Sequence, residues 1–348
     1  MEKEKSISRA WCDGCFDMVH FGHANFLRQA SKMCDELYVG VHNDEEIAKN
    51  KGPPVMTMEE RITMVEGIKW VKKAVPDSPY ITTLHTLEDH KCDFCIHGDD
   101  VTLDASGQDT YRYVREAGRF KECPRTKGVS TTNLVGRMLL LTKEHHRPAT
   151  PTLQSQSQEK SPYTGTCSDS IDLTDEVQRD FLQGREPKEG DRVIYVAGAF
   201  DLFHAGHVEF LQKARAMGDF LVVGLHSDTD VNRYLGKNYP IVTLVERALS
   251  VGACRYVDKL IFPAPFVVDQ EFLDQVKPTK IVHGQHYRAS SDLSMYELPK
   301  RLGIYEELNS GSPLTTEIIM SRIIKNRGEF EERNRKKQLK ELNYLASS

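Results

Sequence analysis

The sequence lacks three features that would place it in particular classes of protein. The first residues, Met1 to Ala10, are charged and contain no apolar core of a signal peptide. No stretch approaches the roughly 20 apolar residues that cross a bilayer. The net charge of −5 provides no basic surplus for nucleic acid as the main partner. We therefore expect a cytoplasmic protein without an integral membrane span and without a nucleic-acid partner.

Cysteine is present, but its pattern does not favour a metal centre. Of the eight cysteines, Cys12 and Cys15 form one CxxC spacing, and Cys92 and Cys95 form another. Both touch strand-like segments, in which residues three apart point to opposite faces, so one strand cannot easily chelate with both thiols. We expect reduced thiols and no metal ligated by the protein alone.

The strongest pattern in the sequence is an internal duplication. Trp11–His23 reappears as Tyr195–His207, at an offset of 184 residues, which is that between His20 and His204. Later pairs follow in the same order at almost the same offset: Glu60-Arg61 with Glu246-Arg247, His97-Gly98 with His283-Gly284, and Thr131-Thr132 with Thr315-Thr316. Ordered matches over this length indicate a duplicated domain, and 348 residues suffice for two cores.

Each copy alternates short apolar runs with helical segments, which predicts an α/β fold. We expect two tandem Rossmann-like domains, each a doubly wound parallel sheet with ligands beyond the carboxyl ends of its strands. The predicted boundaries are 1–141 and 191–327, with a linker at 142–190 that is rich in Pro, Ser, Thr and Gln. Residues 328–348 form a charged tail, interpreted as a solvated helix packed by one stripe of leucines.

The segment His20-Phe21-Gly22-His23, with His204-Ala205-Gly206-His207 in the second copy, carries the clearest chemical signal. Two histidines three apart at a helix start can face one phosphate group, and the glycine lets backbone approach closely. The preceding Gly-x-Phe-Asp predicts a tight turn whose N–H groups can hold phosphate oxygens. A zinc site is the alternative for such a pair, but the spacing places no third ligand nearby.

A second motif, Arg125-Thr126-Lys127-Gly128-Val129-Ser130-Thr131-Thr132, resembles the RTxGxSTT signature of the cytidylyltransferase family, within the HIGH nucleotidyltransferase superfamily. The resemblance covers both copies and implies nucleotidyltransferase domains that take CTP. The duplication without a long membrane helix, and the run Val129–Leu140, resemble those members of the family that act on phosphoethanolamine, so the resemblance implies phosphoethanolamine as second substrate and pyrophosphate as leaving group. Mg²⁺ is expected with CTP.

The resemblance also assigns roles in the first copy. His20 and His23 would donate to the α- and β-phosphate oxygens, Lys51 would reach the same phosphates, and Arg125 would bind the outer ones. The nucleotide-binding set adds residues from both motifs: Cys15, Phe16, Thr126, Gly128, Val129, Ser130, Thr131 and Thr132. On their own, Ser130 to Thr132 are also typical of a helix N-cap and Lys51 of a solvated loop.

Asp13, Asp99 and Tyr80 are the expected phosphoethanolamine-binding residues. The resemblance implies that Asp13 and Asp99 hold the cationic amine. Quaternary ammonium groups are recognised by aromatic cages. With Tyr80 present and Leu103 at a second cage position, the incomplete cage favours a primary ammonium.

The second copy departs from this pattern where charge matters. Ala197 and Gln285 replace Asp13 and Asp99, Asn309 replaces Arg125, and Leu235 replaces Lys51, with Lys237 two residues on. An ammonium removed from water without an anionic partner costs several kcal/mol. We therefore expect the first copy to be catalytic. The second copy keeps candidate nucleotide-binding residues: Ala199, Phe200, His204, His207, His283, Gly284, Gly311, Ser312, Thr315 and Thr316.

Three alternatives remain open from the sequence. The enzyme could use phosphocholine or glycerol 3-phosphate, could transfer an adenylyl group, or could be a nucleotide-binding regulator without turnover. Asp13 and Asp99 argue against glycerol 3-phosphate, which has no cation. Single-copy relatives pair, so the two copies are expected to pair within one chain, and a homo-oligomer and residence near the endoplasmic reticulum are left open.

Overall fold

The computed structural model describes residues 7–100, 102–126, 131–138, 173–285, 294–330, 332 and 335. It divides into two compact units, one formed by Met1–Thr126 with Glu317–Ser348 and the other by Lys127–Thr316. The predicted domain boundaries follow the sequence repeats and stay a prediction, whereas these units follow the packing of the chain.

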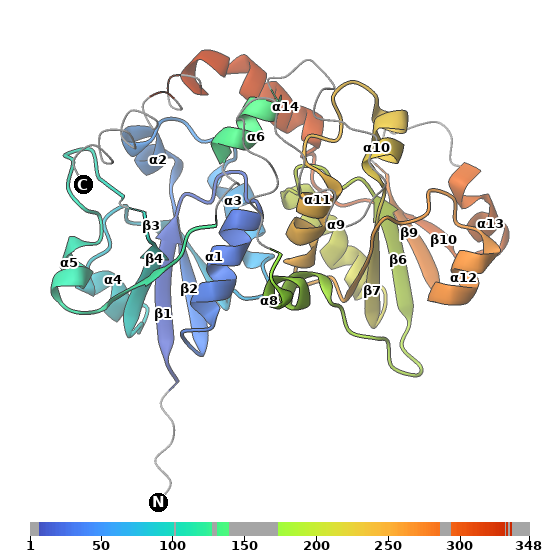
Figure 1. Cartoon of the computed structure of the whole chain (residues 1–348), viewed down its shortest axis with the longest axis horizontal. Coiled ribbons are helices and arrows are strands. Elements are labelled where there is room, and N and C mark those ends of the chain that lie inside the picture. The colour runs from blue at the N-terminus through green and yellow to red at the C-terminus, as the bar shows by residue number, and fades with distance from the viewer. Residues whose placement is uncertain are drawn as a thin grey trace, which may run out of the picture. The chain divides into compact units, whose positions relative to one another are not determined.

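The first unit contains a five-stranded parallel sheet in the order β3-β2-β1-β4-β5. Figure 1 labels β1 to β4 of this sheet. Its strands are β1 (Arg9–Gly14), β2 (Glu36–His42), β3 (Lys73–Ser78), β4 (Phe94–Gly98) and β5 (Phe120–Cys123). The helices between them are α1 (Phe21–Ser31), α2 (Asp44–Asn50), α3 (Met58–Glu66), α4 (Leu84–Asp89) and α5 (Arg112–Glu116).

The second unit repeats this sheet, with the order β10-β9-β6-β7-β8 and all pairs parallel. Its strands are β6 (Val193–Gly198), β7 (Phe220–Leu225), β8 (Lys259–Ile261), β9 (Lys280–Gly284) and β10 (Tyr305–Leu308). Its helices include α9 (Ala205–Ala216), α10 (Asp228–Leu235), α11 (Leu244–Gly252), α12 (Gln270–Val276), η3 (Ser294–Tyr296) and α13 (Glu297–Arg301).

Three more helical segments complete the described chain. Helix α6 (Thr131–Met138) follows the signature motif of the first repeat, and α8 (Asp175–Val177) with η2 (Gln178–Leu182) lies in the predicted linker. Helix α14 (Thr316–Lys325) follows the corresponding motif of the second repeat, but from Glu317 onward it belongs to the first unit. The sequence did not predict that assignment.

Central strands of both sheets have side chains buried on both faces, as is typical of parallel sheets. All six residues of β7 are buried, as are Ala10 to Asp13 in β1. The predicted α/β fold of two tandem, doubly wound parallel-sheet domains is confirmed. Among the described residues, no helix combines the length and the apolar character needed to cross a membrane.

The central strands part at their carboxyl ends. Strand β1 pairs with β2 along its whole length, but with β4 only at Ala10 and Trp11, although it continues to Gly14. This is where the order of strands reverses, which is the position at which open α/β sheets bind ligands. Strands β6 and β9 of the second unit repeat the same short pairing, at Ile194 and Tyr195.

Candidate active site

The loop from β1 to α1 lies at this reversal point and carries the first histidine pair. Phe16 and Met18 have φ angles of 49° and 50°, in the left-handed region that non-glycine residues rarely occupy. The carboxylate of Asp17 is buried and accepts hydrogen bonds from Val55 N and Met56 N, at 3.1 and 3.0 Å. The strained loop is therefore fixed by the segment that precedes α3.

The His20 and His23 rings lie together at the start of α1, with centroids 4.1 Å apart. Nδ1 of His20 accepts a hydrogen bond from Gly22 N at 3.0 Å, and Nδ1 of His23 accepts one from His20 N at 3.4 Å. A neutral ring that accepts at Nδ1 carries its proton on Nε2. Each histidine can therefore present an Nε2–H donor beside the positive end of the helix, an arrangement suited to phosphate oxygens.

Buried Arg61 holds the same loop from α3. Its guanidinium donates to the carbonyl oxygen of Cys15 at 2.7 Å and to Asp44 at 2.6 Å. Cys15 is a predicted nucleotide-binding residue, and the structure fixes it through its backbone, because its carbonyl oxygen accepts the hydrogen bond from Arg61. The ring of Phe16 lies 5.7 Å from that of His23, so Phe16 stands beside the histidine pair.

Lys51 is the C-cap residue of α2 and is followed by Gly52, whose φ of 101° favours glycine. Its ammonium lies 5.9 Å from the centre of the Tyr80 ring. Burial lowers the pKa of both His42 and His97, and the Lys51 charge lowers them further, whereas Asp13 opposes the shift. Lys51, Asp13 and Tyr80 therefore share one electrostatic neighbourhood, which the sequence could predict only through the family resemblance.

Asp13, at the end of β1, is buried and accepts three hydrogen bonds from side chains. Its carboxylate accepts hydrogen bonds from Trp11 Nε1 at 2.8 Å, from Tyr111 Oη at 2.6 Å and from the hydroxyl of Thr82. A carboxylate offers about four acceptor positions, so one position on Oδ1 remains for a further donor. The three partners fix the direction in which Asp13 can meet a cation.

The last predicted carboxylate, Asp99, lies after β4 and is exposed. Its Oδ1 accepts a hydrogen bond from Arg125 N at 2.9 Å. The Arg125 guanidinium lies 3.5 Å from the carboxylate of Asp100, and both side chains are largely exposed. This ion pair places Arg125 near the carboxyl end of β4. His97 belongs to the same strand end, and its ring lies 4.5 Å from that of Tyr111.

The hydroxyl of Tyr80 is buried, and no described residue stands at hydrogen-bonding distance and angle from it. Its ring packs on His42, with centroids 5.0 Å apart. Burial raises the pKa of Tyr80, and Lys51 counteracts part of the rise. A buried hydroxyl without a partner costs free energy, and a ligand group that bonds to it would recover that cost.

Substitution of Tyr111 by Phe tests the anchoring of Asp13. Loss of a hydrogen bond to a buried carboxylate is expected to lower the free energy of unfolding by about 2 kcal/mol, measured from the midpoint of urea unfolding. Tyr113→Phe, at an exposed tyrosine two residues on, is the control and should leave the midpoint nearly unchanged. Equal midpoints for Y111F and the unmodified protein would contradict the anchoring.

Several residues of this site were missed from the sequence. Trp11 could have been found, because it lies two residues before Asp13 on the same face of β1. Thr82 and Tyr111 come from distant segments, and nothing in their local pattern marks them. The Gly-x-Phe-Asp pattern predicts a turn but not the partners of its aspartate. The Asp17 carboxylate accepts hydrogen bonds from the backbone N–H groups of Val55 and Met56 and does not face a ligand.

Part of the predicted nucleotide set lies outside the described residues: Gly128, Val129 and Ser130, together with the side chain of Thr132. Thr131 begins α6. Thr126 accepts a hydrogen bond at Oγ1 from Asn25 of α1 at 2.9 Å, which ties the start of the signature to the helix of the histidine pair.

The second unit keeps the loop but differs in its surroundings. Phe200 and Leu202 repeat the left-handed φ angles, and His204 and His207 stack with centroids 3.8 Å apart. Burial lowers the pKa of His204 to about 3 and that of His207 well below its ordinary value. This pair is therefore uncharged at neutral pH.

The predicted second-copy loops do meet. A Cβ atom on Gly206 would lie 2.8 Å from the carbonyl oxygen of Leu314, so glycine permits this close approach. Thr316 Oγ1 donates to the carbonyl oxygen of Asp201 at 3.1 Å. Gly311 has a φ of 83°, and its N–H donates to Asn309 Oδ1 at 2.7 Å. Four more candidates surround the histidine loop or the ends of its neighbouring strands: Ala199, His283, Gly284 and Ser312.

In the second unit Phe266 packs on His226, with centroids 5.6 Å apart, as Tyr80 packs on His42 in the first. Tyr234 bonds through its hydroxyl to His226 Nδ1 at 3.1 Å and stacks on Phe266. Tyr195, at the position of Trp11, has a buried hydroxyl without a hydrogen-bond partner in the described part of the chain, and Ala197 provides no carboxylate for it. The second unit thus has no anion where the first holds Asp13.

The cysteines are free thiols in the described chain, and no group of three or more His, Cys, Asp or Glu side chains there is arranged to hold a metal ion. Burial raises the pKa of Cys92 to about 12 and that of Cys12 well above its ordinary value. Both thiols are therefore protonated at neutral pH.

Residues 11–137 and 195–308 each match the family model described as cytidylyltransferase-like. An ethanolamine-phosphate cytidylyltransferase of Mus musculus is 50% identical, with 99% of this chain and 93% of that protein aligned. A protein of the same name from Dictyostelium discoideum is 45% identical over 99% of this chain and 98% of its own length. One from Arabidopsis thaliana is 41% identical over 99% and 86%, respectively. Both histidine pairs fall inside the matched segments.

Proposed function

The chain belongs to the cytidylyltransferase-like family, and we propose that its first repeat transfers the cytidylyl group of CTP to phosphoethanolamine. The products are CDP-ethanolamine and pyrophosphate. The observation that carries the chemistry is the histidine pair, whose backbone contacts leave the proton of each neutral ring on Nε2 at the start of α1. The names of these relatives support phosphoethanolamine as the acceptor.

The reaction needs no nucleophile from the protein. A phosphate oxygen of phosphoethanolamine attacks the α-phosphorus of CTP, and the bond to the bridging oxygen of the β-phosphate breaks in line. Negative charge grows on the non-bridging and leaving oxygens. Nε2–H of His20 and of His23 would donate to those oxygens, and this stabilises the transition state more than the ground state.

The cationic side chains complete the phosphate site. We assign Lys51 to the α- and β-phosphates and Arg125 to the outer phosphates, which pass into the leaving pyrophosphate. The Arg125 guanidinium lies only loosely against Asp100, at 3.5 Å, so phosphate oxygens can compete for it. Mg²⁺ enters as part of the substrate MgCTP, neutralising phosphate charge. The signature residues Thr126 and Gly128 to Thr132 stay predicted nucleotide ligands.

The amine is assigned to the pocket around Asp13. The remaining acceptor position on Asp13 and the buried hydroxyl of Tyr80 suit a primary ammonium, which donates hydrogen bonds. A quaternary ammonium has no such donor and relies on aromatic faces. Asp99 is exposed and bonded to Arg125 N, so its part in amine binding rests on the family resemblance.

The second repeat is proposed to lack turnover. It retains a histidine pair and Thr316 beside its loop, so a nucleotide remains its candidate ligand. Its pocket has Tyr234 on Phe266 where a phosphoalcohol would need an anion. The second repeat would then have a role that supports catalysis by the first repeat.

An assay with a panel of phosphoalcohols tests this function. With CTP and Mg²⁺, phosphoethanolamine is expected to release pyrophosphate at least about 100-fold faster than phosphocholine or glycerol 3-phosphate, with CDP-ethanolamine identified by mass spectrometry. Excess EDTA should abolish the release, and added Mg²⁺ should restore it. Preference for ATP over CTP, or for another phosphoalcohol, would assign the chain a different reaction within the superfamily. Binding of CTP without release of pyrophosphate would indicate a regulator.

The product is a precursor of phosphatidylethanolamine, so we place the enzyme in the cytoplasm, close to the membranes of the endoplasmic reticulum where that lipid is made. A homo-oligomer stays a prediction.

A further inference from the structure

We propose that Arg322 of α14, near the end of the second sequence repeat, is a positioning residue for the active site of the first. This inference rests on the proposed function and adds a residue that contacts neither substrate. Nothing in the local sequence marks it, because an arginine in the last turn of a helix ordinarily interacts with the helix end or with solvent.

Arg322 makes a two-pronged ion pair with Glu60 on α3. Nη1 lies 2.6 Å from Oε2 of Glu60, and Nη2 lies 2.8 Å from Oε1. A third contact joins Nη1 to the carbonyl oxygen of Val55 at 3.3 Å. The two side chains are mostly shielded from water, with 32% and 17% of their surfaces exposed. A bidentate, partly buried pair of this kind constrains geometry far better than an exposed surface pair.

Glu60 already has a local role that makes the contact more than a surface attachment. Its Oε2 also accepts Thr57 N at 2.9 Å and so closes the capping box at the start of α3. Arg322 therefore binds the first turn of α3 through the same Glu60 oxygen, Oε2, that closes the capping box at the start of the helix.

The contact leads in one step to the phosphate loop. Val55, whose carbonyl oxygen receives Arg322, donates its own N–H to Asp17, and so does Met56. Asp17 holds the left-handed loop that delivers His20. Three residues separate Val55 from Lys51, so Arg322 fixes the far end of the short segment that carries this lysine. The arrangement makes α14 a brace on both the histidine loop and the lysine.

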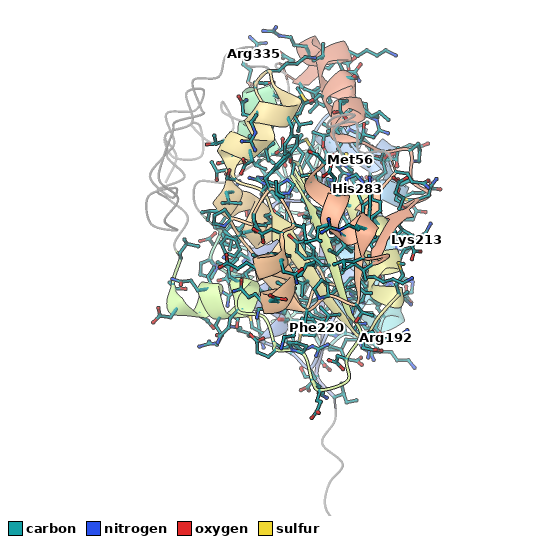
Figure 2. The ribbon with its side chains drawn as sticks, turned by 90° about the vertical axis from the view of Figure 1, so that its right-hand side faces the viewer. Met56, Arg192, Lys213, Phe220, His283 and Arg335 are labelled. Atoms are coloured by element: carbon teal, nitrogen blue, oxygen red, sulfur yellow. The ribbon has the colours of Figure 1, made fainter. Side chains whose placement is uncertain are left out.

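The experiment compares five variants of the full-length protein, one of them the double variant R322A/E60Q, with the unmodified enzyme. R322A removes the brace, R322K keeps the charge without the fork, and E60Q removes the charge while its amide oxygen can still close the capping box. The control is R335A, since Arg335 pairs only with Glu332 among the ion pairs of the described chain, at 2.7 Å in an exposed position. Met56 follows Val55 in the segment that Arg322 contacts. Figure 2 shows Arg335 well apart from Met56.

R322A is expected to lower kcat about tenfold while KM for CTP and for phosphoethanolamine changes less than about twofold, because positioning errors act on the transition state. R322K should recover part of the loss, E60Q should reproduce most of it, and the double variant should be no slower than R322A. R335A should match the unmodified enzyme. Each variant is assayed at least 10 °C below its melting temperature, so unfolding does not contribute.

Two results would overturn the inference. One is an R322A enzyme with unchanged kcat, and the other is independent, multiplying losses in R322A and E60Q. These results are distinguishable from failure of the proposed function, which would show as an unmodified protein that releases no pyrophosphate from CTP and phosphoethanolamine.

Discussion

The double variant H20A/H23A is expected to lose at least about 1,000-fold in kcat, with pyrophosphate release as the measurement. Removal of one preorganised donor to a developing negative charge costs about 100- to 1,000-fold in related situations, and this variant removes two. KM for CTP should rise much less than kcat falls, because the donors act mainly on charge that appears in the transition state.

The matched control is H204A/H207A, which removes the equivalent pair from the second repeat. It is expected to keep most of the turnover, because the pocket beside that pair has Ala197 and the aromatic stack of Tyr234 on Phe266 in place of a carboxylate. If H204A/H207A were inactive and H20A/H23A active, the catalytic repeat would have to be reassigned. Circular dichroism should show both variants folded.

Lys51→Ala is expected to lower kcat about 100-fold, which corresponds to a loss of about 2.7 kcal/mol of transition-state stabilisation. The ammonium lies beside Tyr80 in the electrostatic neighbourhood of Asp13, where a phosphate bridging the two substrates would meet it. Steady-state kinetics with both substrates varied would measure the loss.

Lys49→Ala controls for the loss of one positive charge on the same helix. Lys49 is exposed in the last turn of α2, two residues from Lys51. K49A should retain normal kcat. A similar small loss in K49A and K51A would mean that Lys51 contributes only to the general field and makes no contact with the phosphates.

Much of the fold could be predicted because its signals are local. Repeated apolar runs such as Tyr195 to Gly198, followed by a helix, indicate parallel β-α units wherever they occur, and the offset between His20 and His204 relates the two copies. The histidine pair could be placed at a helix start for the same reason. What the sequence could not provide was the tautomer of each ring, which depends on backbone hydrogen bonds.

The rest of the site depends on contacts between distant segments. Asp13 is joined to Tyr111 across 98 positions, and Glu60 to Arg322 across 262. No periodic pattern records such pairs, and a single sequence contains no co-variation. The same limit applies to the division of the chain, since α14 completes the second repeat in sequence but belongs largely to the first unit in space.

The backbone contacts of His20 and His23 imply an acid-sensitive helix start. A proton added to Nδ1 of His20 would point at the N–H of Gly22, and one added to Nδ1 of His23 would point at the N–H of His20. Protonation at either Nδ1 would thus set one donor against another and cost these two contacts at the first turn of α1. The backbone contacts therefore suit the neutral form of both rings, which keeps an Nε2–H donor on each.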